Sequence, residues 1–413
     1  MGMKSNQMSI ETDVAIIGAG PSGLGAAIQL RKANVGEVLI IDRESEAGGI
    51  PRHCGHPPFG VREFYRVLSG PNYARKLTNR ALDFGAKLLL NHSVTRLMPC
   101  AQFEVATNNG LKIVKAKRVL IATGVRETPR SARLVSGSRP TGITTTGALQ
   151  SMVYLKNLMP FKKPLVVGTE LVSFSAIMTC YKKGIRPVGM IEPGDRIVAR
   201  KPFQLLAKTL SVPIFYNSQV EEIIGDKKVE GVRIRNKVTK ESVVVDCDGV
   251  VFSGQFTPES SLGRMSHLEI DYRSGAYVVD QFGRCSDATY YAAGNVLHPV
   301  ETAGWSFREG SLIGELIAND IKDLDCRVDG PKIEIDGAFK WVLPQKLSTS
   351  NYNGLKWIQL RAKNALQGTI NIEIDGILWK RKRVSTLPER RILIPISELG
   401  EFSKKKVIKL SFS

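Results

Sequence analysis

The sequence predicts an α/β protein with two Rossmann-like dinucleotide-binding domains, the second inserted into the first, followed by a small all-β appendix. Two observations support this fold class. Glycine-led strand–turn–helix units begin at Gly18 and at Gly168, and an acidic residue closes each second strand 24 residues later, at Asp42 and at Glu192. After about residue 331 the pattern changes to short alternating strands.

The first unit has every feature of a dinucleotide-binding turn. The apolar run at 14–17 indicates a buried parallel strand, and Gly18 makes the tight turn after it. Gly20 has no Cβ, so its backbone can approach a pyrophosphate, and Gly23 lets the next helix pack closely. Pro21 suits the first helical position, from which free N–H groups face the phosphates.

Three further glycine-containing segments extend this pattern. Gly48-Gly49 follows Asp42 closely, and later strands end at Thr123-Gly124 and at Gly294-Asn295. The set resembles the flavoproteins with two dinucleotide-binding domains, the class of glutathione reductase, in which the first domain binds FAD. The resemblance implies FAD contacts at Gly18, Gly20, Pro21, Ser22, Gly23, Asp42, Arg43, Gly49, Val94, Thr123, Gly124, Gly294, Asn295 and Thr302. That class has Asp where this chain has Asn295, whose amide can still donate and accept.

The second unit has lost two of its glycines. Glu170 stands where backbone should meet pyrophosphate, and Ser173 takes the close-packing position. Two unit charges about 4 Å apart repel by about 4 kcal/mol at an effective dielectric constant near 20. Glu192 at the ribose position further disfavours NADPH. We therefore expect no NAD(P)H in the usual pose. The alternatives are that this domain binds another adenine nucleotide (ATP or ADP), that it binds no nucleotide, or that it contains a remodelled NADH site.

The chain divides into three predicted domains. The FAD-binding domain comprises residues 10–150 and 275–325, the NAD(P)-like domain 151–274, and a basic β-rich domain 331–413. Ile-Glu-Ile-Asp-Gly occurs at 333–337 and again at 372–376, which predicts two related hairpins. Further strands are expected at 356–361, 391–396 and 407–412.

Composition argues against several classes of protein. The six cysteines of the 413 residues show no Cys-x-x-Cys and no regular spacing, so we expect no disulfide framework, iron–sulfur cluster or other metal site. No apolar run reaches the roughly 18 residues of a membrane helix. Since the N-terminus is short and polar, a cytoplasmic location is expected.

The net charge of +19 is concentrated near the end of the chain, where residues 331–413 hold 16 Lys and Arg against 7 Asp and Glu. Either this surface docks an acidic partner or RNA, or it is simply solvated. No aromatic-interleaved RNA motif occurs, so a nucleic-acid partner is not expected.

His53, Cys54 and Glu301 are the candidate catalytic residues near the flavin. The redox-disulfide branch of these flavoproteins has a cysteine pair just after Gly-Gly, whereas Cys54 stands alone. Disulfide reductase chemistry is therefore excluded unless a distant cysteine joins it. The cluster of His53, Cys54 and His56 either moves protons, lines a channel or fills space.

The segments 48–60, 144–150 and 294–305 resemble a narrower family, the FAD-containing large (alpha) chains of bacterial opine oxidases, hydrogen cyanide synthase and hydroxyproline or proline dehydrogenases. The resemblance covers roughly residues 12–322. It implies a hetero-oligomeric amine dehydrogenase in which a second flavoprotein subunit oxidises an amine or amino acid. This chain then relays electrons towards an electron carrier. Many relatives end in a cysteine-rich iron–sulfur domain, which a basic β appendix replaces here.

Two other functions remain open for the same fold. One is an NAD(P)H:acceptor oxidoreductase, and the other is a non-catalytic scaffold subunit that holds a flavin.

Overall fold

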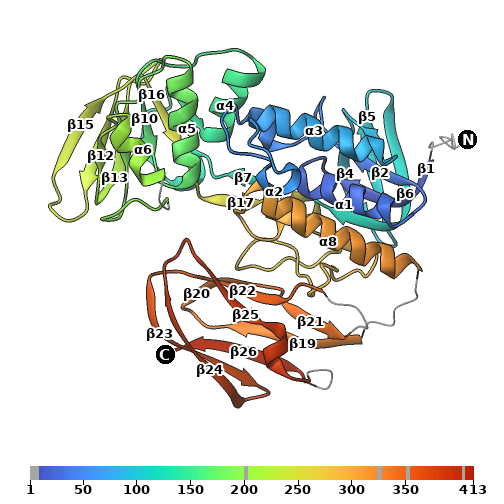
Figure 1. Cartoon of the computed structure of the whole chain (residues 1–413). Helices are drawn as coiled ribbons and strands as arrows, with labels where there is room; N and C mark the ends of the chain where they lie inside the picture. Colours follow the sequence, from blue (N-terminus) through green and yellow to red (C-terminus); the bar gives the residue numbers. More distant parts are fainter. Residues whose placement is uncertain (1–8, 200–202, 323–327, 350–353, 402–404) are drawn as a thin grey trace, which may run out of the picture. The chain divides into compact units, whose positions relative to one another are not determined.

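The computed structural model describes residues 9–199, 203–322, 328–349, 354–401 and 405–413. The chain forms two compact units, each with a parallel sheet of Rossmann type, and this confirms the predicted α/β fold class (Figure 1). Unit 1 contains the segments up to residue 49, 74–125 and 258–413, and unit 2 contains 50–73 and 126–257. The three predicted domain ranges stay predictions. Residues 323–325 and Cys326 lie outside the described residues.

Unit 1 is built on a seven-stranded sheet with helices from distant parts of the sequence. Its strands are β1 (Ser9–Ile17), β2 (Val38–Ile41), β3 (Lys87–Leu89), β4 (Ser93–Met98), β5 (Gln102–Thr107), β6 (Gly110–Ile121) and β18 (Tyr290–Ala292). Its helices are α1 (Pro21–Lys32), α3 (Gly70–Asp83) from residue 74 onward, α7 (Ser261–Arg264), α8 (Ala303–Lys322) and the short η3 (Gly294–Val296).

The sheet order of unit 1 places β1, which the glycine turn follows, in the middle of the sheet. The order is β3-β2-β1-β6-β5-β4, with β18 also paired to β6. Strands β3, β2, β1, β6 and β18 are parallel, whereas β4 and β5 form an antiparallel extension. The carboxyl ends of β1, β2, β6 and β18 therefore lie at one edge, where ligands of such sheets bind.

Helices α1 and α8 pack closely because three glycines line their contact. A Cβ atom at Gly25 would lie 2.6 Å from the Phe307 carbonyl oxygen, and one at Gly314 would lie 2.7 Å from that of Ala26. A Cβ at Gly310 would clash with the backbone of Ser22. This packing fixes the segment that enters α8 beside the first turn of α1.

Unit 2 contains the second Rossmann-type sheet and an antiparallel sheet. Its elements are η1 (Ile50–His53), α2 (Val61–Phe64), η2 (Arg130–Arg133), β8 (Ser136–Gly137), β9 (Ile143–Thr145), α4 (Thr146–Leu155), β10 (Pro164–Val167), α5 (Leu171–Lys182), β11 (Gly189–Ile191), α6 (Phe203–Thr209), β12 (Ile214–Phe215), β13 (Ser218–Ile224), β14 (Gly231–Asn236), β15 (Ser242–Asp246) and β16 (Gly249–Phe252). The parallel sheet has the order β12-β11-β10-β16-β9 and the other sheet β15-β14-β13-β8. Strands β7 (Val125–Glu127) and β17 (Phe256–Pro258) pair where the chain passes between the units.

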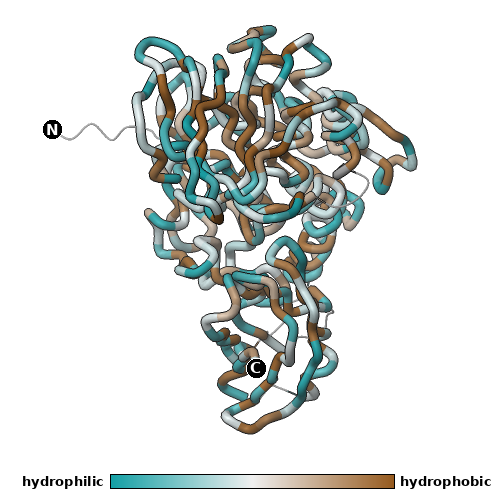
Figure 2. Tube along the Cα trace, turned by 90° about the vertical axis from the view of Figure 1, so that its left-hand side faces the viewer, coloured by the Kyte–Doolittle hydropathy of each residue, from teal (hydrophilic) through white to brown (hydrophobic). Residues whose placement is uncertain are grey.

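The C-terminal β region belongs to unit 1 and contains two sheets around an aliphatic core. Its elements are β19 (Val328–Ile335), β20 (Phe339–Leu343), β21 (Lys346–Thr349), β22 (Trp357–Ala362), β23 (Leu366–Ile374), β24 (Ile377–Thr386), β25 (Arg391–Pro395), η4 (Ile396–Leu399) and β26 (Val407–Phe412). The sheet orders are β21-β19-β26-β23-β24 and β20-β22-β25. Figure 2 shows hydrophobic stretches of chain alternating with hydrophilic ones.

Of the two predicted hairpins, one is confirmed and one is wrong. Strands β23 and β24 pair across Asp375-Gly376, and both of these residues have positive φ, as a two-residue hairpin turn requires. The matching segment that ends at Gly337 instead leads from β19 into β20, which lies in the other sheet. Gly337 does not have positive φ there, so the same five letters give a different turn.

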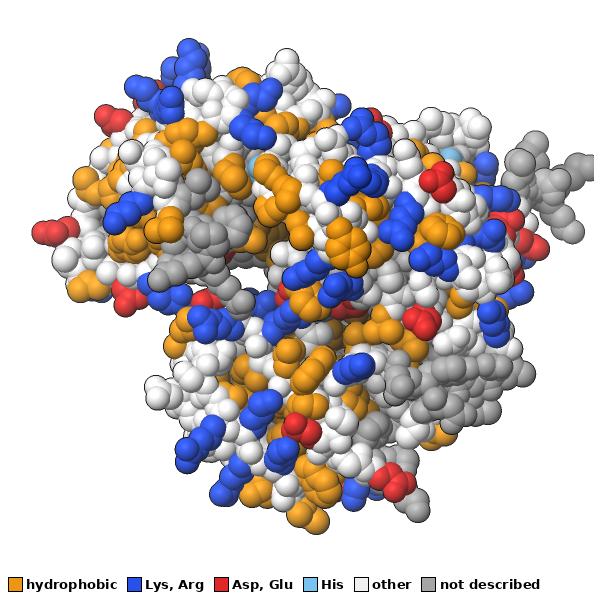
Figure 3. Space-filling model, viewed as in Figure 1, with side chains coloured by type: hydrophobic (Ala, Val, Ile, Leu, Met, Phe, Trp, Pro, Cys, Tyr) orange, Lys and Arg blue, Asp and Glu red, His pale blue; other side chains and the backbone are white. Residues whose placement is uncertain are grey.

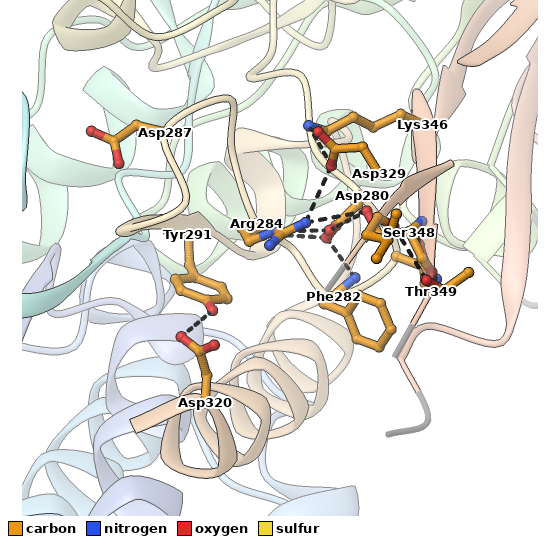
Figure 4. Close-up of polar contacts among 12 residues, drawn as sticks. Asp280, Phe282, Arg284, Asp287, Tyr291, Asp320, Asp329, Lys346, Ser348 and Thr349 are labelled. Atoms are coloured by element: carbon orange, nitrogen blue, oxygen red, sulfur yellow. Dashed lines mark hydrogen bonds and ion pairs between the residues drawn. The ribbon is translucent and has the colours of Figure 1, made fainter. Parts of the chain in front are cut away.

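A buried polar junction joins the β region to the Rossmann part of unit 1 (Figure 4). The fully buried carboxylate of Asp280 accepts hydrogen bonds from Arg284 Nε at 3.2 Å and from Ser348 Oγ at 2.9 Å. Trp341 and Leu343 of β20 also belong to the core under the seven-stranded sheet. The appendix is therefore an integral part of unit 1.

Basic side chains are scattered among hydrophobic and neutral ones on the face shown in Figure 3. Among the helices that the structure describes, none is both long and apolar enough to cross a membrane.

The α1–α8 contact gives a test of the fold. We expect Gly310→Ala to lower the free energy of unfolding by about 1–3 kcal/mol through overpacking, although Ala is the better helix former by about 1 kcal/mol. Gly337→Ala is the matched control, because a Cβ there meets no atom within 4 Å. Urea unfolding followed by circular dichroism measures both, and equal stability of the two variants would contradict this packing.

Candidate dinucleotide-binding site

The turn after β1 is held by contacts that leave no room for side chains. Gly18 has φ +111°, and a Cβ there would lie 2.5 Å from the Ala122 carbonyl oxygen. Its N–H donates to the Ile41 carbonyl at 2.8 Å. A Cβ at Gly23 would clash with the Gly18 carbonyl, so the helix is locked onto the turn. The turn is thus fixed to β2 and β6.

Gly20 differs from its neighbours because the space beside it is open. A Cβ there meets no protein atom within 4 Å, although Gly20 directly precedes the first residue of α1. Gly49 forms a second wall, since its own Cβ would lie 2.9 Å from the Gly20 Cα. This cradle of bare backbone at a helix N-terminus fits the diphosphate of a dinucleotide.

The carboxylate at the end of β2 is already oriented. Asp42 Oδ2 accepts from the Ala19 N–H at 2.7 Å and Oδ1 from the Glu44 N–H at 2.9 Å. Each oxygen keeps a second lone pair, so both can accept ribose hydroxyls. Arg43 is exposed beside Glu44, and Val94 is half-buried in β4. Their cofactor contacts stay predictions.

Two buried hydroxyls point to a polar group that the chain itself does not supply. Within the described residues, Ser22 Oγ and Ser306 Oγ have no hydrogen-bond partner. Ser22 lies in the first turn of α1, and a Cβ at Gly294 would sit 2.9 Å from its Oγ. Since buried hydroxyls are normally hydrogen-bonded, their position beside the turn fits a bound dinucleotide. Thr123 Oγ1 instead donates a hydrogen bond to the Glu259 carbonyl, at 2.7 Å.

Asn295 holds the segment that leads into α8. Its Oδ1 accepts from the Glu301 N–H at 2.8 Å, and its Nδ2 donates to the Glu301 carbonyl at 3.1 Å. An ionised Asp could not make the second bond, which is a physical reason for Asn here. Thr302 directly precedes α8, and its carbonyl accepts from Trp305 N–H at 2.9 Å.

A buried ion pair under this segment escaped the sequence reasoning. His298 Nε2 lies 2.6 Å from Glu309 Oε2, and Glu309 Oε1 accepts from the Gly294 N–H at 2.7 Å. Burial opposes the charged imidazole, but the Glu309 carboxylate outweighs it and raises the pKa of His298. His298 stood within a recognised motif, yet only the fold reveals its partner on α8.

In unit 2 a side chain fills the place that is open beside Gly20. The Glu170 carboxylate contacts Gly168, and a Cβ at Gly254 would lie 2.5 Å from its Oε1. Ser173 Oγ donates to Glu170 Oε2 at 2.9 Å. Burial raises the pKa of Glu170. The residue thus places its own carboxylate at the N-terminus of α5.

The carboxylate of Glu192, the acidic residue at the end of β11, is also hydrogen-bonded within the protein. Glu192 is 5% exposed, accepts from Thr169 Oγ1, and accepts from the Gly194 N–H at 2.8 Å. Arg133 donates to the Ser253 and Gly254 carbonyls at 3.0 and 2.7 Å. These contacts stabilise the second turn internally.

The side chains of Cys54 and His56 are held by contacts within unit 2. Burial raises the pKa of the Cys54 thiol to about 12, and its Sγ lies 3.5 Å from Gln150 Oε1. His56 hydrogen-bonds Ser175, which also accepts from Gln150 at 2.7 Å. Burial therefore disfavours the thiolate, which is the nucleophilic form of cysteine. The catalytic roles of His53, Cys54 and Glu301 stay predictions.

Comparisons with known proteins agree with this geometry. The model of the pyridine nucleotide-disulphide oxidoreductase family matches residues 12–310. Thioredoxin reductase of Listeria monocytogenes is 27% identical over 76% of this chain and 94% of its own length. An opine oxidase subunit of Rhizobium meliloti is 28% identical over 44% of this chain and 38% of its own length. The structure of L-proline dehydrogenase from P. horikoshii has a TM-score of 0.59 at 21% identity, covering 76% of this chain and 56% of that one.

The open space at Gly20 predicts a variant that folds but does not bind FAD. We expect Gly20→Val to raise the FAD dissociation constant at least about a hundredfold, or about 2.8 kcal/mol, because its side chain occupies the cradle. The apoprotein should still fold, because a Cβ there meets no atom within 4 Å, and its melting temperature should fall only by the poorer capping of α1 by Val. Fluorescence titration with FAD measures the affinity, and retention of wild-type affinity contradicts the site.

The raised pKa of Glu170 predicts a pH-dependent stability difference. A carboxyl whose folded pKa is raised loses stability as pH rises above its unfolded value, because the folded state then holds more protons than the unfolded state. Glu170→Gln should therefore be more stable than wild type at pH 7, and the difference should shrink as the pH falls towards the ordinary carboxyl value of 4.5. Unfolding curves across this pH range measure it. A variant that is less stable at pH 7 would refute the inference.

Proposed function

Because the chain belongs to the pyridine nucleotide-disulphide oxidoreductase family, we propose that it is the FAD-dependent, electron-transferring subunit of a dehydrogenase acting on an amino acid or secondary amine. The observation that carries the FAD part is the open cradle at Gly20, flanked by the buried Ser22 hydroxyl, which has no hydrogen-bond partner among the residues that the structure describes. The amine part rests on the resemblance to the opine oxidase chain and to L-proline dehydrogenase.

Each residue of the cradle has a defined task. The bare backbone at Gly20 and the N-terminus of α1 bind the diphosphate, and Asp42 binds ribose hydroxyls. When bound, FAD supplies two-electron redox chemistry. Helix α8 begins at Ala303, and its positive end favours negative charge nearby by about 0.3–1 kcal/mol. Asn295 orients the segment before that helix.

A nicotinamide is not the proposed electron donor. The Glu170 carboxylate fills the second turn and repels phosphate, and Glu192 is buried against Thr169. ATP or ADP in this domain stays a prediction, and the same carboxylate opposes its phosphates at this turn. Electrons therefore come from another source, which we propose to be a partner flavoprotein subunit.

A disulfide reductase is not favoured either, although thioredoxin reductases are among the relatives. The sequence has no Cys-x-x-Cys pair, and the five cysteines within the described residues are free. Cys54 is buried with a pKa raised to about 12. Disulfide exchange needs an accessible thiolate, whereas the Cys54 side chain is buried and burial raises the pKa of its thiol.

The proposed assembly contains a second flavoprotein subunit, an electron carrier and a small amine or amino-acid substrate. The relative from Rhizobium meliloti is one subunit of an oxidase, which supports a complex of several chains. The cytoplasm is the proposed location.

Anaerobic stopped-flow absorbance tests this function. The FAD-loaded chain is mixed with NADH, with NADPH and with proline as a secondary-amine probe. A relay subunit should show no millisecond flavin reduction with any of them. After chemical reduction it should pass electrons to an artificial acceptor. Rapid reduction by NADH would establish the nicotinamide oxidoreductase instead. Reduction by proline alone would contradict the relay role, and a reduced flavin that no acceptor reoxidises would indicate a scaffold.

A further inference from the structure

We propose that Arg361 and Arg391 of the C-terminal β region are positioning residues of the FAD site, acting through Glu301. The inference rests on the proposed FAD site in the same unit. It gives the basic appendix a task that its sequence did not suggest.

The two arginines share one carboxylate that is largely removed from water. Glu301 Oε1 lies 3.4 Å from Arg361 Nη2 and 3.2 Å from Arg391 Nε. The exposed fractions of the side chains are 11% for Glu301, 13% for Arg361 and 22% for Arg391. Solvent screens such pairs less than exposed ones, so the contact can hold a segment in place.

The strand register explains why a carboxylate is needed at this point. Arg361 on β22 and Arg391 on β25 are directly opposed in the antiparallel pairing of these strands. Like charges directly opposite each other destabilise a sheet. Glu301 comes from outside the sheet and supplies the opposite charge to both. The β region therefore presents a ready receptor for one carboxylate.

Glu301 transmits this restraint to the glycine turn. Its backbone N–H and carbonyl are both bonded to the Asn295 side chain, which directly follows Gly294. A Cβ at Gly294 would lie 2.8 Å from the Ser22 Cβ in the first turn of α1. The contacts thus run continuously from the two arginines to the cradle.

A second contact fixes the start of α8. The Arg391 guanidinium lies 5.1 Å from the centroid of the Trp305 ring, in the first turn of that helix. Arg391 Nη1 also donates to Gln359 Oε1 at 3.1 Å, so the guanidinium is held on its own sheet. Stacking on an aromatic ring and pairing with a carboxylate at once needs the planar guanidinium of Arg.

The test compares two double variants with the same loss of charge. R361Q/R391Q removes the receptor, and the matched control R381Q/R383Q removes two exposed arginines of β24. We expect the FAD dissociation constant of the apoprotein to rise about tenfold or more in the first variant. The control should stay within about twofold of wild type, since exposed charges contribute little. Fluorescence titration gives the affinities.

Other outcomes are equally decisive. Unchanged FAD affinity in R361Q/R391Q overturns the proposal, and so does an equal loss in the control. If R361Q/R391Q fails to fold by circular dichroism, E301Q decides, because it removes only the shared carboxylate and changes no residue of the β region. Weaker FAD binding by folded E301Q supports the proposal, and wild-type binding overturns it. A wild-type chain that takes up no FAD is a different result, which refutes the proposed function itself.

Discussion

The absence of a Cβ atom at Gly20 is the constraint on which the site depends. A diphosphate can bind main chain at a helix N-terminus only where no side chain intervenes. Gly18 and Gly23 are needed to close the turn, whereas Gly20 is needed only to keep space open. The second unit has the same strand–turn–helix geometry, but Glu170 fills the corresponding space with a carboxylate. One chain thus contains an open anion-binding turn at Gly20 and a second turn in which the Glu170 carboxylate occupies the corresponding space.

This contrast indicates different roles for the two glycine-led turns. The first turn leaves polar groups to be satisfied, such as the hydroxyl of Ser22, while the second turn satisfies its groups internally through Ser173 and Thr169. The first turn can therefore receive a ligand, and we propose that the second holds no NAD(P)H in the usual pose. The C-terminal β region belongs with the first, because Asp280 and Glu301 tie it to the Rossmann core of unit 1.

Sequence reasoning predicts the parts of the site that depend on local backbone chemistry. The turn at Gly18 and the acid at Asp42 follow from spacing and residue type alone, and the structure places them at the carboxyl ends of the neighbouring parallel strands β1 and β2. The partners of the Glu301 carboxylate could not be predicted, since Arg361 and Arg391 lie on strands that reach it only through tertiary packing. The partners of Asn295 and His298 are nearer in sequence, at Glu301 and Glu309, but spacing alone does not assign these contacts. The hairpin predicted at Asp336-Gly337 was wrong for a related reason: the core decides which sheet accepts a strand, and the turn residues only permit a hairpin.

The most direct measurement is the stoichiometry of FAD uptake by the intact apoprotein, followed by visible absorbance and equilibrium titration. The account predicts one FAD per chain, with NADH unable to displace it or to add a second equivalent. A protein that stays colourless after reconstitution would contradict it at the first turn. A second dinucleotide bound with comparable affinity would contradict the interpretation of Glu170.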